Sequence, residues 1–145
     1  MHRQTLPGFE LAAPLRKDCH ALGRLPFSQV LLLNKREVPW FILVPQTSEI
    51  ELCDLSAAAQ LALQQEINLL SRFVRTQFAV TKLNVAAIGN IVSQLHIHVI
   101  GRHVEDAWWP HVAWGQASVG GYDASRVSEI AALLIEQLGD DYRPV

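Results

Sequence analysis

The stretch Gln94-Leu95-His96-Ile97-His98-Val99-Ile100-Gly101-Arg102 alternates polar and apolar side chains, which predicts a β-strand over residues 95–102 that is buried on one side. Successive strand side chains point to opposite sides of a sheet. His96 and His98 therefore share one side, with backbone positions roughly 6.5 Å apart, so both rings can contact one phosphate-sized group. The opposite side, expected to pack on the core, carries Leu95, Ile97 and Val99.

Two imidazoles on one side of a strand either pack as structural side chains or take part in chemistry. An imidazole with a free pKa of roughly 6.5 is largely unprotonated at neutral pH, so it can attack phosphorus. The product is a phosphorus–nitrogen bond that water later breaks, which divides one difficult displacement into two easier ones. The polar turn over 89–93 and Arg102 lie at the two ends of the strand and supply donors for a phosphate group.

A metal site is the rival chemical interpretation, because HxH on a strand is a common ligand pair. A cupin-like site would be sketched from His96, His98, His103, Glu105 and His111. Cupin barrels are built from many short strands and have no place for a long helix over 54–78. We therefore expect no metal ion.

Composition describes an ordinary globular chain. A length of 145 residues suits a single domain over 1–145, and the formal charge of −2 argues against polymeric nucleic acid as a ligand. Half of the residues are hydrophobic, which favours a homodimer that covers apolar surface. Cys19 and Cys53 do not form a CxxC pair, no apolar run approaches the ~20 residues of a membrane span, and residues 1–10 contain no apolar signal segment. We expect a cytoplasmic protein without a membrane partner.

The motif strand is expected to lie in an α+β domain with a mainly antiparallel sheet of about five strands. Runs rich in β-formers over 27–33 and 40–44, joined by turn residues, predict a hairpin. A further strand over 81–88 is expected to pair with 95–102. These segments form the motif-bearing core over about 25–102.

Two helices and two irregular segments complete the prediction. Apolar residues at three- and four-residue steps predict a long helix over 54–78, with Asp54 or Ser56 as its N-cap. Asp123 and Gly139 bracket a second helix, as N-cap and C′ residue, within the segment 103–145, which begins with a Trp-rich loop over 103–122. Scattered Pro and Gly over 1–25 predict an irregular N-terminal arm that contains at most a short strand or turn.

The motif resembles that of the histidine triad family, His-φ-His-φ-His-φ-φ with φ hydrophobic, in which Gln94 stands at the first histidine here. The match extends over about residues 25–102. It includes the polar loop before the strand, Gly101-Arg102 after it, the strand WFILVP and the long helix. The resemblance implies a HIT-like fold. It also implies a nucleotidyl hydrolase or transferase that acts on a nucleoside phosphoramidate or a dinucleoside polyphosphate and needs no cofactor.

The resemblance assigns a role to each matching residue. His96 would attack the α-phosphorus and form a nucleotidyl-histidine, and His98 would hydrogen-bond the phosphate. Gln94 can orient its neighbours but cannot carry a titrating proton, and Trp40 stands where many relatives have a supporting histidine. These two departures leave open a nucleotide-binding protein with little or no catalysis. Substrate contacts are expected from Asn34, Asn84, Asn90, Ser93 and Arg102.

Overall fold

Six strands form one antiparallel sheet in the order β4-β5-β3-β2-β1-β6 in a computed structural model that describes residues 7–145. The strands are β1 (Cys19–Arg24), β2 (Ser28–Leu33), β3 (Trp40–Pro45), β4 (Lys82–Ala86), β5 (Ile97–Arg102) and β6 (Arg143–Pro144). The helices are α1 (Ala13–Asp18), η1 (Leu52–Asp54), α2 (Ala57–Gln77), α3 (Ala124–Leu138) and η2 (Gly139–Asp141). The expected α+β class is confirmed, with six strands where about five were predicted.

The central strands pair as the hydrophobic runs predict. β2 and β3 form the hairpin, and β5 lies between β3 and β4, with Ile42 opposite His98 and Ala86 opposite the same residue on the other side. The strands of the motif-bearing core are therefore direct neighbours.

The N-terminal segment differs from the irregular arm predicted over 1–25. Residues 1–6 of that prediction lie outside the described residues, but α1 and β1 are regular. Pro14 occupies the first turn of α1, where its missing N–H is not needed, and Gly23 follows a register shift in β1. Leu22 is buried in the core, so the helix breakers of this segment mark a helix start and a β-bulge.

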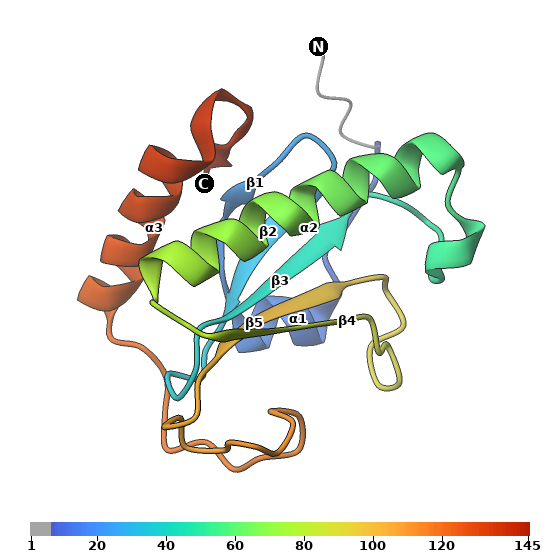
Figure 1. Ribbon diagram of the computed structural model, residues 1–145. Helices are drawn as coiled ribbons and strands as arrows, with labels where there is room; N and C mark the ends of the chain where they lie inside the picture. The colour runs from blue at the N-terminus through green and yellow to red at the C-terminus, as the bar shows by residue number, and fades with distance from the viewer. Residues whose placement is uncertain (1–6) are drawn as a thin grey trace.

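Helix α2 covers one face of the sheet (Figure 1). Ser56, one of the two predicted N-caps, accepts a hydrogen bond from the Ala59 N–H at 3.1 Å, so the helix begins at Ala57. Phe73 packs edge-on against Phe41 of β3, with ring centroids 5.8 Å apart. The main core on this face also includes Leu63, Leu70, Val74, Ile97 and Val99.

The opposite face of the sheet is covered by α1 and by the Trp-rich loop. Figure 1 shows α1 behind the sheet, on the side away from α2. The second apolar cluster consists of Leu15, Leu31, Val38, Trp40, Ile42, Val44, Ile100, Trp108 and Ala113. His96 and His98 project to this side, because Ile97 and Val99 pack under α2.

Helix α3 packs beside α2, and the short β6 then pairs with β1 at the sheet edge. The predicted caps are confirmed: Asp123 accepts a hydrogen bond from the Arg126 N–H at 2.9 Å, and Gly139 ends the helix with a φ of 74°. Over residues 7–145, no helix is both long and apolar enough to span a bilayer.

Candidate functional site

The two histidines of the motif are buried neighbours at the start of β5. His96 and His98 are 6% and 7% exposed, and their ring centroids lie 4.9 Å apart. Burial in a packed sheet restricts both rings to one orientation, so the hydrogen bonds at their nitrogens decide which chemistry each can perform.

A hydrogen bond to the backbone fixes the proton of His96 on Nδ1 and leaves Nε2 unprotonated in the neutral ring. Its Nδ1 lies 2.7 Å from the backbone oxygen of Gln94. A carbonyl oxygen only accepts hydrogen bonds, so Nδ1 carries the proton and donates it. The neutral ring then has its lone pair on Nε2, which receives no hydrogen bond from the described residues.

His98 is held in the other neutral tautomer, because its Nδ1 accepts a hydrogen bond instead of donating one. The indole Nε1–H of Trp40 donates to His98 Nδ1 at 2.9 Å, and an indole nitrogen can only donate. The proton of His98 is therefore on Nε2. Burial, followed by the neighbouring His96, lowers the pKa of His98 to about 4, so this ring is neutral at neutral pH. The result is a fixed N–H donor beside the lone pair of His96.

A group of tryptophans surrounds the His98 ring. Trp40 and Trp114 contact it edge-on, with centroids 5.8 and 5.2 Å away, and Trp40 also contacts Trp108 at 6.4 Å. Trp40 and Trp108 are buried, as packing residues are expected to be. The donor role of Trp40 was missed at the sequence level. Its signal was the antiparallel pairing of the 40–44 and 95–102 runs, which brings position 40 beside the histidines.

Gln94 contributes to the site through its backbone. Its side-chain oxygen accepts a hydrogen bond from the Ala12 N–H at 2.8 Å, and its side-chain nitrogen donates to the Glu10 oxygen at 2.8 Å. The carboxamide thus attaches the N-terminal segment to the motif, while the carbonyl of the same residue orients His96.

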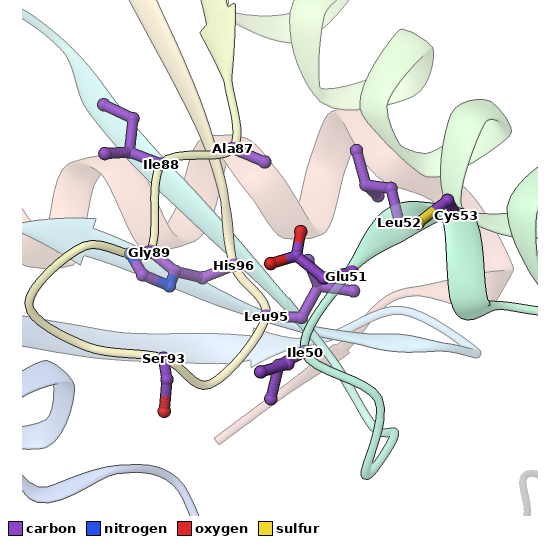
Figure 2. A pocket seen from close by; sticks show the side chains of 10 residues that line it. All are labelled: Ile50, Glu51, Leu52, Cys53, Ala87, Ile88, Gly89, Ser93, Leu95 and His96. Atoms are coloured by element: carbon purple, nitrogen blue, oxygen red, sulfur yellow. The ribbon is translucent and has the colours of Figure 1, made fainter.

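A pocket of about 280 Å³ adjoins His96. Figure 2 shows its two walls, the Ile50–Cys53 segment before α2 and the loop that carries Gly89 and Ser93, with His96 between them. Ser93 is exposed at this pocket, so the structure brings it together with His96. Asn90 belongs to the same loop and is exposed, but it is not one of the lining residues.

Arg102 and Asn84 lie on the same side of the sheet as the histidines but form a separate cluster. The Arg102 side chain is 2% exposed and contacts Asp106 at 2.7 and 3.1 Å and Asn84 Oδ1 at 3.1 Å. Burial alone would raise the pKa of Asp106, but hydrogen bonds from Arg102 and from two backbone N–H groups lower it to about 2. The charge of Arg102 is therefore neutralised within the chain, and Arg102 lies four positions, roughly 13 Å, from His98.

Asn34 lies at the far end of the hairpin from His96. Its Oδ1 contacts His20 Nε2 at 2.9 Å and accepts a hydrogen bond from the Tyr122 N–H at 2.9 Å. The structure therefore joins β1, β2 and the C-terminal loop at Asn34 and does not bring it together with the histidine pair. Within residues 7–145, His, Cys, Asp and Glu side chains form no group of three that could hold a metal ion, so the cupin-like ligand set is not assembled there.

Comparisons with known proteins show which family and fold this chain resembles. A model of the HIT domain family matches residues 15–105. The crystal structure of a histidine triad protein from Bradyrhizobium japonicum is 36% identical, with a TM-score of 0.86 over 90% of this chain and 98% of that chain. The corresponding values are 34%, 0.88, 91% and 98% for a histidine triad protein from Sinorhizobium meliloti, and 39%, 0.85, 90% and 96% for one from Marinobacter aquaeolei.

A more distant structure shows the fold alone. The NitFhit protein of C. elegans is 17% identical, with a TM-score of 0.57 over 78% of this chain and 26% of that chain. A search of curated proteins finds no match. The expected HIT-like fold is confirmed by these structures.

Proposed function

Because the chain belongs to the HIT domain family, whose members are generally nucleotide hydrolases and transferases, we propose that it is a nucleotidyl hydrolase or transferase. Its substrate is a nucleoside phosphoramidate or a dinucleoside polyphosphate, and the reaction proceeds through a nucleotidyl-histidine at His96. The observation that carries this proposal is the pair of fixed tautomers, with a lone pair on His96 Nε2 beside an N–H on His98 Nε2.

In the first step, the lone pair of His96 Nε2 forms a bond to the α-phosphorus. The bond from phosphorus to the leaving nitrogen or oxygen breaks, and its electron pair departs with the leaving group, which takes a proton from solvent where its basicity requires one. The ring of His96 now carries a positive charge. The Gln94 carbonyl stabilises this charge, because it already accepts the Nδ1–H bond.

In the second step, the oxygen of water or of another acceptor attacks phosphorus from the open side. The phosphorus–nitrogen bond breaks and its electron pair returns to His96 Nε2, while the acceptor releases its proton to solvent. The neutral enzyme and a nucleoside monophosphate, or its ester, result. No cofactor takes part in either step.

The charge that gathers on the phosphoryl oxygens needs hydrogen-bond donors. His98 Nε2–H is the first of these, since its other nitrogen is committed to Trp40. Ser93 supplies a second from the pocket wall. Asn90 in the same loop, Asn84 and Asn34 stay predictions, and the pairing of Arg102 with Asp106 favours a structural role for that residue.

Nucleotide binding without turnover is the second candidate function. Trp40 blocks Nδ1 of His98 and the Gln94 side chain is bonded to the N-terminal segment, so neither group can relay a proton to the leaving group. Turnover then depends on solvent for that proton. An inert complex is expected if solvent cannot supply it.

Trapping the intermediate separates the two functions. The protein is incubated with adenosine phosphoramidate labelled in the nucleoside, quenched in alkali and examined by mass spectrometry. We expect an adenylylated peptide that contains His96, and a loss of activity of roughly a thousandfold or more in His96→Ala. His111→Ala, which removes an exposed imidazole from the Trp-rich loop, is the matched control and should keep its activity. Binding of AMP without any adenylylated peptide would favour the inert complex.

We also propose a cytoplasmic homodimer in which the β4 edges of two copies pair. β4 is an edge strand of the sheet, and Val85 on it is 45% exposed beside a groove formed with α2. An unpaired edge with an exposed apolar residue is a template for another strand. Light scattering should give twice the monomer mass for the native chain and the monomer mass for Val85→Lys. The same substitution at Val119, an exposed residue of the Trp-rich loop, should leave the dimer intact.

A further inference from the structure

The pocket beside His96 is lined by one carboxylate, by the uncharged polar side chain of Ser93, by Cys53 and by apolar side chains. Glu51 is the charged lining residue, and Figure 2 shows its carboxylate between the two walls of the pocket. The apolar part of the lining comes from Ile50, Leu52, Ala87, Ile88 and Leu95. Glu51 is exposed, and among the described residues no Lys or Arg forms an ion pair with it. The carboxylate is thus free to meet a ligand.

The chain segments that build this pocket are without positive charge. The segments 41–71 and 83–101 contain no Lys or Arg, whereas 41–71 contains Glu49, Glu51, Asp54 and Glu66. Arg102, which lies on the histidine side of the sheet, is neutralised by Asp106. A polyphosphate leaving group would enter a space whose lining holds the negative charge of Glu51 and no Lys or Arg, which is unfavourable.

We propose that this pocket receives the leaving group, and that Glu51 selects a leaving group with an apolar chain and a positive charge over a polyphosphate. The inference rests on the proposed function and chooses between its two substrate classes. The apolar lining contacts the methylene groups of an amine, and the carboxylate pairs with a second, protonated amino group at the end of that chain. A volume of about 280 Å³ suits such a group, since it is at the small end of the usual size of ligand pockets.

Release of such an amine involves the same bond changes as the first step of the proposed reaction. His96 Nε2 bonds to phosphorus, and the phosphorus–nitrogen bond of the phosphoramidate breaks with its electron pair on the amine. A proton from solvent, which reaches the open pocket, makes the departing amine neutral. Glu51 forms no covalent bond and acts only on the charge at the distal end of the leaving group.

Two substrates that differ by one charge test this selection. Adenosine phosphoramidates of pentylamine and of cadaverine have the same chain length, and the second ends in an ammonium group. Native protein should use the cadaverine compound with a kcat/KM about fivefold higher, the size that an exposed ion pair supports. Diadenosine tetraphosphate, whose leaving group is anionic, should be used more slowly than either.

Three variants locate the effect. Glu51→Gln should lower the cadaverine-to-pentylamine ratio of kcat/KM to about one, and Glu51→Lys should invert it and raise the use of diadenosine tetraphosphate. Glu49→Gln removes the same charge from a residue outside the pocket lining and should keep the native ratio. Equal slowing of both phosphoramidates in Glu51→Gln would overturn the inference, because Glu51 would then hold the nucleotide half of the substrate.

Failure of the inference and failure of the proposed function give different results. If adenylylated His96 forms from both phosphoramidates with no dependence on charge, the function stands and the inference is wrong. If none of the substrates yields the adenylylated peptide, the proposed function itself is wrong.

Discussion

The two ends of the polar side of β5 differ in how their hydrogen-bonding groups are used. At the Arg102 end, three guanidinium nitrogens donate to Asp106 and Asn84. At the histidine end, each ring makes one hydrogen bond through Nδ1, and neither Nε2 atom makes a hydrogen bond to the described residues. The comparison shows that a polar residue on a strand indicates function only when part of its bonding capacity is unused.

The largest effect is expected at the Arg102 end and should fall on stability. Asp106→Ala leaves a guanidinium that is 2% exposed without its counter-charge, which should lower the free energy of unfolding by about 3–5 kcal/mol. Urea unfolding measures this loss. Glu129→Ala breaks the exposed Arg126–Glu129 pair and should change stability by less than about 1 kcal/mol.

Activity should separate the two ends as well. In a temperature range where Asp106→Ala is folded, its turnover per folded molecule should equal that of the native chain, because Arg102 is not at the histidine pair. A large loss of turnover there would show that the two ends act together and would remove the distinction between them.

An intermediate effect is expected from pH at the histidine end. The pKa of His98 is lowered to about 4 in the folded chain, whereas the unfolded chain has an ordinary histidine. Between these two values the unfolded state binds more protons, so stability should fall as the pH falls from about 6.5 to about 4, by up to about 1.4 kcal/mol per pH unit. Asp106, whose pKa is lowered to about 2, should lose its contribution only at lower pH, from about 4 downward.

Trp40→Phe tests the cause of that slope. Without the indole N–H, Nδ1 of His98 is free to take a proton, so the pKa of His98 should rise and the slope between pH 4 and 6.5 should become smaller. The pKa of Glu66 is raised by burial and opposes the slope, but Glu66 lies on α2 and contacts Phe27, so it affects both proteins equally. Urea unfolding at a series of pH values measures how stability depends on pH in each protein. An equal dependence in both proteins would show that the Trp40 hydrogen bond does not keep His98 unprotonated.

The smallest effect is expected from the side chain of Gln94. Gln94→Ala removes two hydrogen bonds to the backbone of Glu10 and Ala12, which should lower stability by about 1–2 kcal/mol. Because His96 is oriented by the carbonyl of residue 94, turnover should change little. Hydrogen exchange should become faster at the Ala12 amide, and unchanged exchange there would show that the segment is held by other contacts.

Local sequence patterns determined most of the secondary structure. Alternation placed His96 and His98 on one side of β5, and residues at helical steps with Ser or Asp caps defined α2 and α3. These features depend on neighbours within a few residues, so the chain order alone is sufficient. The N-terminal helix was missed and β1 was expected at most as a short strand, because Pro14 and Gly23 usually break such elements. They are tolerated here at a helix start and beside a bulge.

Tertiary structure decided what each site residue can do. The tautomer of His98 depends on Trp40, which is 58 positions away, and the side chain of Gln94 is bonded to residues more than 80 positions away. The sequence predicts a phosphate contact from Arg102, but the guanidinium is paired with Asp106, and Asn34 is hydrogen-bonded to His20 and Tyr122. The sequence shows which donors and acceptors exist, but only the packed chain determines which of them are already paired and which are left for a substrate.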